Sequence, residues 1–183
     1  LSLIPDAATA VMVPFAAQPS LIMCCDILEP TTGQPYGRDP RSVAKKAEAY
    51  LGSTGVGDTA YFGAEPEFFV FDDVRYDVQM NASFYEIDSE EGPWVTGKMF
   101  EEGNTGHRPC IKGGYFPVPP FDSAHALRAA MVNVMQQKGL SMDTHHPEVA
   151  PSHLEIAPTF SPLVHSAAKS QISKSCAPIA PAP

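Results

Sequence analysis

Residues 63–71 read Gly-Ala-Glu-Pro-Glu-Phe-Phe-Val-Phe, a stretch that is apolar except for its two acids, Glu65 and Glu67. Aromatic and β-branched residues favour a pleated, well-buried strand. Pro66 cannot donate to a strand ladder, so it predicts a bulge or a sheet edge at that point. Side chains two residues apart leave a strand from the same face. The stretch therefore predicts a strand that carries two carboxylates side by side.

Two like charges on a half-buried surface repel each other and lose hydration, which is costly unless a positive charge lies between them. Oxygen ligands of this kind suit magnesium or manganese. The alternative is that Glu65 and Glu67 both face solvent on an edge strand. The spacing alone leaves both interpretations open.

A second group of ionisable side chains occurs in a segment that is otherwise rich in Val, Ile and Ala. Its members are Asp143, His145, His146, Glu148, His153 and Glu155. The spacing does not match the H-E-x-x-H zinc helix, and Pro147 argues against a helix there. Histidines in such a group often form hydrogen bonds to a loop backbone, whereas the acids from two separate segments favour a metal site. Both hypotheses stand at this point.

Three helices are predicted from capping residues and apolar periodicity. The first begins after Asp39, which can cap free amides, with Pro40 at the first helical position, and it ends at Gly52 or Gly55. A second helix should begin at 122 or 123 and close at Gly139, and a third should cover 163–174. We expect the first helix to bury the apolar face made by Val43, Ala47, Tyr50 and Leu51.

Strands are predicted wherever short apolar runs lie between turn signals. The expected segments are a single buried strand at 21–28, one or two strands in 59–72, a hairpin around 83–87, and strands in 140–150 and 152–157. Residues 77–107 read as a long polar excursion, in which Asp88, Glu90 and Glu91 should form a solvated loop. Residues 113–120, Gly-Gly-Tyr-Phe-Pro-Val-Pro-Pro, predict a stiff connection.

Composition excludes several classes of protein. The chain has 183 residues, of which 44% are apolar, so it can bury a core. The formal net charge is −9 and no segment concentrates Lys and Arg, which argues against a nucleic-acid partner. No apolar run reaches the roughly 18 residues of a membrane span. Nineteen prolines predict short elements and exclude a helical bundle.

Several catalytic motifs are also missing from the sequence. There is no P-loop, no G-x-G-x-x-G loop and no G-x-S-x-G nucleophile elbow. No C-x-x-C pair indicates a zinc ribbon, so we expect the four cysteines to be free thiols in a reducing cytoplasm. They are Cys24, Cys25, Cys110 and Cys176.

Seven motifs occur in the order found in bacterial type I glutamine synthetase, which residues 4–156 therefore resemble. The motifs are Ile-Pro-Asp-Ala at 4–7, Cys-Asp-Ile-Leu-Glu-Pro at 25–30, Arg-Asp-Pro-Arg at 38–41, the stretch 63–71, Asn-Thr-Gly-His-Arg-Pro at 104–109, Lys-Gly-Gly-Tyr-Phe-Pro-Val-Pro-Pro at 112–120, and 145–150. The resemblance implies an α+β fold in which a curved, mainly antiparallel sheet lines the site and helices pack outside. It also implies a cytoplasmic ligase that joins ammonia to glutamate with ATP, through γ-glutamyl phosphate.

The resemblance further assigns roles by motif position. Glu65 falls at the Mg²⁺ or Mn²⁺ that clamps the ATP phosphates. Glu67, Glu148 and Glu155 fall at the ligands of the other metal, near the glutamate, and Asp143 falls near the nucleotide. The partners implied are glutamate, ammonium, ATP and further copies of the chain, which in the family form a dodecamer, with neither nucleic acid nor membrane.

The chain departs from the family pattern in several places. Pro147 stands where the family has a histidine, and the interval between Glu148 and Glu155 is one residue short. A one-residue slip in a strand turns a side chain to the opposite face. Either a bulge restores Glu155, therefore, or the centre loses a ligand.

Because other ligands expected of the family are missing from these 183 residues, we expect residues 1–176 to be part of a catalytic domain that is inactive alone. Residues 177–183 should form a disordered tail. Two alternatives remain open, a γ-glutamyl-amine ligase of the same superfamily and a non-catalytic truncated remnant or assembly partner.

Overall fold

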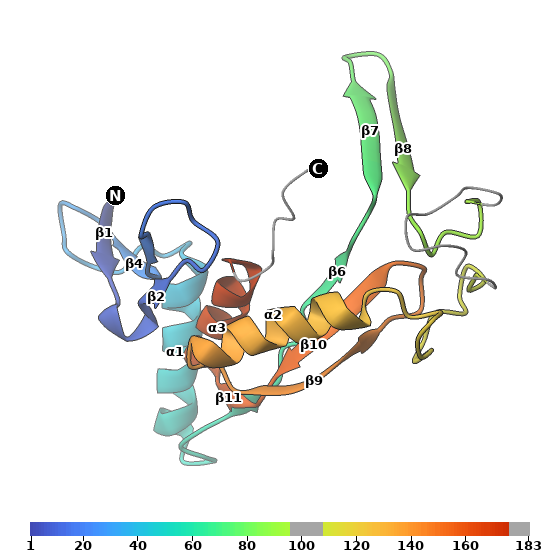
Figure 1. Ribbon diagram of the computed structural model, residues 1–183. Helices are drawn as coiled ribbons and strands as arrows, with labels where there is room; N and C mark the ends of the chain where they lie inside the picture. Colours follow the sequence, from blue (N-terminus) through green and yellow to red (C-terminus); the bar gives the residue numbers. More distant parts are fainter. Residues whose placement is uncertain (96–107, 176–183) are drawn as a thin grey trace. The chain divides into compact units, whose positions relative to one another are not determined.

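The computed structural model describes residues 1–95 and 108–175, which form a mixed α+β fold with small antiparallel sheets (Figure 1). The α+β class expected from the resemblance is thereby confirmed. Within the described part, the chain forms two compact units. Unit 1 contains residues 1–64, 133–143 and 157–175, and unit 2 contains 65–95, 108–132 and 144–156. Residues 104–107, Cys176 and the predicted tail 177–183 lie outside the described residues.

Unit 1 contains three pairs of short antiparallel strands. β1 (Ser2–Pro5) pairs with β4 (Cys25–Leu28), β2 (Val11–Met12) with β3 (Leu21–Ile22), and β5 (Tyr61–Phe62) with β11 (Ser161–Pro162). The 3₁₀ helix η1 (Ala7–Thr9) follows β1.

The prediction of one buried strand at 21–28 is wrong, because β3 and β4 belong to different sheets and their residues are only half-buried or exposed. The break lies at Cys24. Its amide donates to Thr9 Oγ1 at 2.8 Å, and its carbonyl accepts from the Asp6 amide at 2.9 Å. Cys24 therefore bonds to the turn around η1 rather than continuing a strand.

The first predicted helix forms as α1 (Pro40–Thr54), with the expected ends. The Asp39 carboxylate accepts from the amides of Arg41 and Ser42, and Gly55 ends the helix at a φ of 70°, which favours glycine. The predicted apolar face is wrong, since Val43 is 52% exposed and Tyr50 71% exposed. α1 contacts α3 (Leu163–Ser175) instead, where the Val164 amide donates to Glu48 Oε1 at 3.0 Å.

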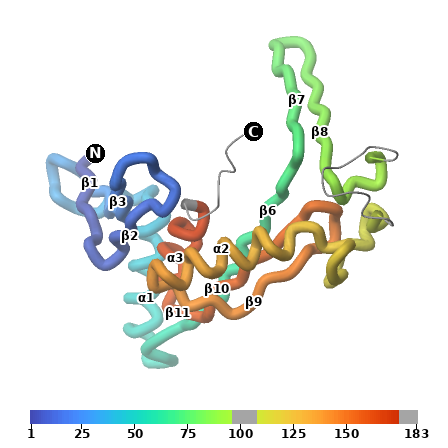
Figure 2. The backbone as a smooth tube through the Cα atoms, in the orientation of Figure 1, coloured from blue at the N-terminus to red at the C-terminus, as the bar shows by residue number. Residues whose placement is uncertain are grey.

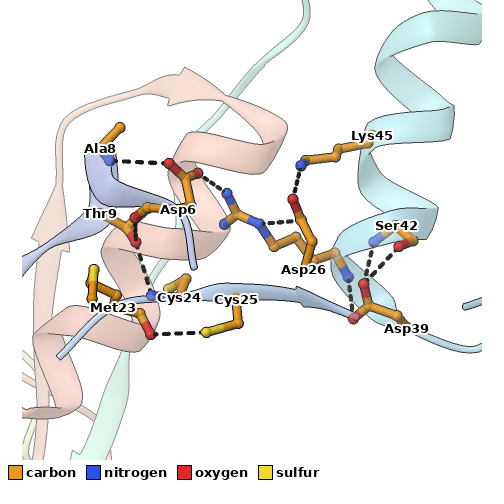
Figure 3. A network of polar contacts seen from close by, with 11 residues as sticks. Asp6, Ala8, Thr9, Met23, Cys24, Cys25, Asp26, Asp39, Ser42 and Lys45 are labelled. Carbon is orange, nitrogen blue, oxygen red and sulfur yellow. Dashed lines mark hydrogen bonds and ion pairs between the residues drawn. The ribbon is translucent and has the colours of Figure 1, made fainter. Parts of the chain in front are cut away.

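A network of ion pairs joins α1 to the first strand pair (Figure 3). Arg41 pairs with both Asp6 and Asp26, and Lys45 also pairs with Asp26. The hydrogen bond from Lys45 lowers the pKa of Asp26, as does Arg41, and together they outweigh the opposing effect of burial. These contacts fix the start of α1 against β4 and the turn after β1.

In unit 2, β6 (Glu67–Phe69) lies next to β10 (His153–Pro158), and β10 lies next to β9 (Met142–Pro147). β9, β10 and α2 (His125–Gln137) each continue into unit 1. A long hairpin of β7 (Asp73–Val78) and β8 (Ser83–Asp88) follows β6, as the backbone trace of Figure 2 shows. The strands in 59–72, 140–150 and 152–157 form where the sequence predicts them, and Pro66 lies between β5 and β6. The hairpin is longer than the one expected around 83–87, because 83–88 is a single strand that pairs with 73–78.

The predicted solvated loop at 88–91 is only partly correct, because Glu91 is 7% exposed. Its Oε1 accepts from the amide and the hydroxyl of Ser123, at 3.0 and 2.9 Å, and its Oε2 accepts from the Ser152 amide at 2.7 Å. A buried carboxylate with three donors is well satisfied. Glu91 thus ties the segment before α2 to the turn before β10, a role that no local charge pattern predicts.

No helix among residues 1–95 and 108–175 is long and apolar enough to cross a membrane. Cys24, Cys25 and Cys110 are free thiols, as expected of the described cysteines.

Replacing Arg41 by Leu should lower the free energy of unfolding by about 1–2 kcal/mol, since Asp6 and Asp26 lose their shared partner while partly buried. The matched control is Arg75→Leu on the hairpin, where the arginine side chain is 51% exposed, and this should cost less than about 1 kcal/mol. Urea unfolding followed by circular dichroism measures both. Equal losses would contradict the structural role of Arg41.

Low pH should reduce the folding stability of unit 1, because it protonates Asp26. Because the folded-state pKa of Asp26 is lowered from its ordinary value of 3.8, its stabilising effect is complete above 3.8 and is lost as the pH falls through the folded value. Asp26→Asn should therefore reduce stability at pH 7 and flatten the acid limb of the stability curve. Unfolding midpoints between pH 7 and pH 2 test this, and an unchanged acid limb would refute it.

Candidate metal centre

The register between β6 and β10 brings three carboxylates together. The two strands are antiparallel, and Glu155 lies directly opposite Glu67. Directly opposed residues project from the same face of a sheet with neighbouring Cβ atoms. Glu65 precedes β6, and the carbonyl of the intervening Pro66 accepts from the Ile156 amide at 3.3 Å. As a result, Glu65, Glu67 and Glu155 each place a carboxylate oxygen within 4.8 Å of the others.

A second group shares Glu155 and adds residues from β9 and the turn that follows it. His146 Nδ1 lies 3.5 Å from Glu148 Oε1, and His146 Nε2 lies 3.5 Å from Glu155 Oε2. The side chains of these three residues are 8–14% exposed. The imidazole therefore lies between two carboxylates that are largely removed from solvent.

Burial raises the pKa of Glu155, and the neighbouring carboxylates of Glu148 and Glu65 raise it further, whereas His146 acts in the opposite direction. Glu155 therefore lies where negative charge is poorly compensated. Among the described residues, the ion-pair partners of Glu67, Glu148 and Glu155 are histidines, namely His153 for Glu67 and His146 for the other two.

The donor set fits a divalent cation. The two groups offer oxygens from four carboxylates and one imidazole nitrogen, and Glu155 belongs to both groups. Hard divalent cations take several carboxylate oxygens, and manganese also accepts imidazole. A cation would also offset the repulsion that raises the pKa of Glu155. The exposure of Glu65 and Glu67 leaves one side of the set open to solvent.

The segment between Glu148 and the first residue of β10 forms a turn. The Glu148 amide donates to the His153 carbonyl at 2.6 Å, and the His153 amide donates to the Ala150 carbonyl at 3.1 Å. Ser152 takes a φ of 61°, uncommon for a residue with a side chain. The turn leads directly into β10, where Glu155 lies opposite Glu67 in a regular register.

The glycine-rich connection at 113–120 lies against this turn. A Cβ on Gly114 would lie 2.6 Å from the Glu148 carbonyl oxygen, so only glycine allows the Gly114 amide to donate to the Val149 carbonyl at 2.9 Å. Phe116 stacks on the imidazole of His146, with ring centroids 4.3 Å apart. The connection thus covers one face of His146, a contact that the sequence did not predict.

A buried ion pair supports β9 from α2. Arg128 is 1% exposed and donates to both carboxylate oxygens of Asp122, at 2.8 and 2.6 Å. Its Nε donates to His145 Nδ1 at 3.3 Å. Burial lowers the pKa of His145, and the positive charge of Arg128 lowers it further, so this histidine is neutral and accepts the hydrogen bond. His145 therefore contacts the buried arginine, whereas His146 lies against two of the acids.

The structure brings together the four glutamates predicted to bind metal, but it places Asp143 elsewhere. Glu65, Glu67, Glu148 and Glu155 come together in unit 2, and their role as metal ligands remains a prediction. Asp143 is exposed in the part of β9 that belongs to unit 1, and its nucleotide role also remains a prediction. The sequence grouped His146 and His153 with the acids but did not indicate which acid each would contact.

The chain matches a protein-family model over most of its length. Residues 37–179 match the model described as glutamine synthetase, catalytic domain. This range includes the residues of both candidate groups.

Curated relatives cover nearly all of the chain. A glutamine synthetase from Azospirillum brasilense is 54% identical over 169 residues, covering 92% of this chain and 36% of the relative. One from Methylococcus capsulatus is 60% identical over 148 residues, covering 81% and 32%. A protein from Cupriavidus pinatubonensis, named 3-hydroxylaminophenol mutase, is 51% identical over 173 residues, covering 94% and 37%. The chain therefore spans about a third of the length of the curated relatives it matches.

Solved structures support the fold. The cryo-electron microscopy structure of Plasmodium falciparum glutamine synthetase superposes with a TM-score of 0.76 at 22% identity, covering 96% of this chain and 35% of that one. A crystal structure described as a novel glutamine synthase homolog gives a TM-score of 0.60 at 19% identity, covering 96% and 33%.

Arg128→Met should destabilise unit 2 by about 3–5 kcal/mol, because it leaves the buried Asp122 carboxylate without its main partner. The double variant Asp122→Leu/Arg128→Met should be more stable than the single variant, since it removes the uncompensated charge. Urea unfolding of both variants tests this. A single variant within 1 kcal/mol of the parent, or a double variant that is no more stable, would contradict it.

Proposed function

Because the chain belongs to the glutamine synthetase family, we propose that it carries part of the catalytic centre of an ATP-dependent ligase that joins ammonia to glutamate through γ-glutamyl phosphate. The observation that carries the proposal is the presence of two neighbouring ligand groups, Glu65/Glu67/Glu155 and His146/Glu148/Glu155, that share Glu155. Glu148 and Glu155 are largely buried, and buried carboxylates close together are costly to a folded chain unless a cation or other positive group compensates them.

In this proposal, each acid holds one of two Mg²⁺ or Mn²⁺ ions. Glu65 serves the ion at the ATP phosphates, and Glu67, Glu148 and Glu155 serve the ion near glutamate. Bound cations would supply charge neutralisation between the anionic glutamate and the transferred phosphoryl group. The protein's part is to orient the carboxylates and to limit water, which the burial of Glu148 and Glu155 supports. Asp143 is assigned to the nucleotide.

The complete reaction is proposed for a longer protein, because the chain spans about a third of its relatives. We propose that the 183 residues alone bind a divalent cation without turnover, and that the complete protein is a homo-oligomer, a dodecamer by resemblance. A cytoplasmic location also remains part of this proposal.

Two other functions make different predictions. A γ-glutamyl-amine ligase would release phosphate faster with a larger amine than with ammonium. A non-catalytic remnant would bind no divalent cation stoichiometrically. The shortened interval before Glu155 first suggested a remnant, but Glu155 still lies with the other acids, which favours a cation-binding role.

Glu67→Gln should weaken Mn²⁺ binding by tenfold or more, because it removes a ligand charge from the cluster. The matched control is Glu86→Gln on the hairpin, whose side chain is 62% exposed and pairs with Arg75, and it should bind like the parent. Isothermal titration calorimetry on the 183-residue chain measures both. Equal effects, or no stoichiometric binding by the parent, would contradict the site.

The reaction itself is tested on the complete gene product. Phosphate release should require ATP, glutamate and ammonium together, and ammonium should be preferred over methylamine, ethylamine and polyamines. Preference for a larger amine would replace the proposed function with the γ-glutamyl-amine alternative.

A further inference from the structure

His153, the first residue of β10, lies against Glu67. Its Nε2 is 2.9 Å from Glu67 Oε2, within ion-pair distance. The histidine side chain is 19% exposed, whereas that of Glu67 is 43% exposed. His153, the better buried of the two, therefore restrains the side chain of Glu67.

The imidazole is itself held in place by its ring contacts. Phe69 lies directly opposite His153 in the register, and the two rings stack with centroids 4.3 Å apart and planes within 4°. Phe69 in turn stacks on Phe71 at 5.6 Å. Stacked rings limit rotation about the side-chain bonds, so the Nε2 atom has a defined position.

The backbone on both sides of His153 is also fixed. The amide and the carbonyl of His153 are both bonded within the turn, to Ala150 and Glu148. The Ser152 amide donates to the buried Glu91, and the Ser152 carbonyl accepts from the Val70 amide at 3.1 Å. His153 therefore presents its Nε2 from a rigid support.

The ion-pair contact with His153 has a chemical consequence for Glu67. A carboxylate has two oxygens, and His153 engages only Oε2. Carboxylates that bind metals are commonly held by hydrogen bonds from a second group, which fixes their orientation. Because Glu67 is the more exposed of the paired residues, it would otherwise sample several rotamers and lose entropy on binding a cation.

We propose that His153 is a positioning residue of the metal centre: it holds one oxygen of Glu67 so that the other oxygen is presented to the cation together with Glu65 and Glu155. The inference rests on the proposed function, because it requires the cation site. It assigns to His153 a role through Glu67 and not a place among the ligands.

The test uses Mn²⁺ binding to the 183-residue chain. His153→Phe keeps a ring that can stack on Phe69 but removes the donor, and it should raise the dissociation constant at least tenfold. His153→Gln keeps an amide donor and should restore most of the affinity. His153→Ala is a second donor-free variant and should show the same loss as His153→Phe. The control is His125→Phe, which changes a histidine whose side chain is 56% exposed outside the acidic groups and should bind like the parent.

A spectroscopic readout separates positioning from direct ligation. Electron–nuclear double resonance of bound Mn²⁺ detects nitrogen bonded to the metal. The nitrogen signal should be the same in the parent and in His153→Gln, because His153 does not touch the ion. Loss of a nitrogen coupling in His153→Gln would make His153 a ligand and overturn the inference. Melting temperatures in EDTA confirm that each variant folds.

The outcomes also distinguish this inference from the proposed function. If the parent binds Mn²⁺ and Glu67→Gln weakens it, but His153→Phe and His153→Ala bind within twofold of the parent, only the role of His153 fails. If the parent binds no Mn²⁺, the metal centre fails and the inference fails with it.

Discussion

The antiparallel register that sets Glu155 opposite Glu67 is the constraint on which the candidate centre depends. A shift of one residue would turn Glu155 toward the face of Leu154 and Ile156, which are almost fully buried. The burial of those two residues therefore opposes such a shift. Glu91 adds a further restraint, because it accepts a hydrogen bond from the Ser152 amide in the turn before β10. Packing and polar contacts thus select the same register.

The same register also destabilises the fold, because it brings carboxylates together. Burial raises the pKa of Glu155, and the nearby carboxylates of Glu148 and Glu65 raise it further; buried charge of this kind opposes folding unless something compensates it. His146 and His153 compensate only part of it, since they serve three acids between them. Functional sites commonly retain such unfavourable arrangements, which the remainder of the fold has to stabilise. The centre therefore depends on supports outside it, such as the buried pair of Asp122 and Arg128.

The motifs that carry the family resemblance have more than one physical role. Those at 4–7, 25–30 and 38–41 supply Asp6, Asp26 and Arg41, and these residues form an ion-pair network within unit 1. The stretch at 63–71 supplies acids to the candidate centre, and Gly114 allows a second stretch to approach the turn at 148–150. A long shared motif is therefore not by itself a sign of chemistry.

The sequence by itself determined the features that depend on neighbouring residues. Asp39, Pro40 and Gly55 set the ends of α1, and the stretch at 63–71 indicated Glu65 and Glu67 as paired acids. Only the tertiary structure decided which distant groups meet: His153 with Glu67, Glu91 with Ser152, and α1 with α3 through a face other than the apolar one. Caps and alternation follow from backbone geometry within a few residues, whereas these pairings depend on strand register and on packing between segments far apart in the chain.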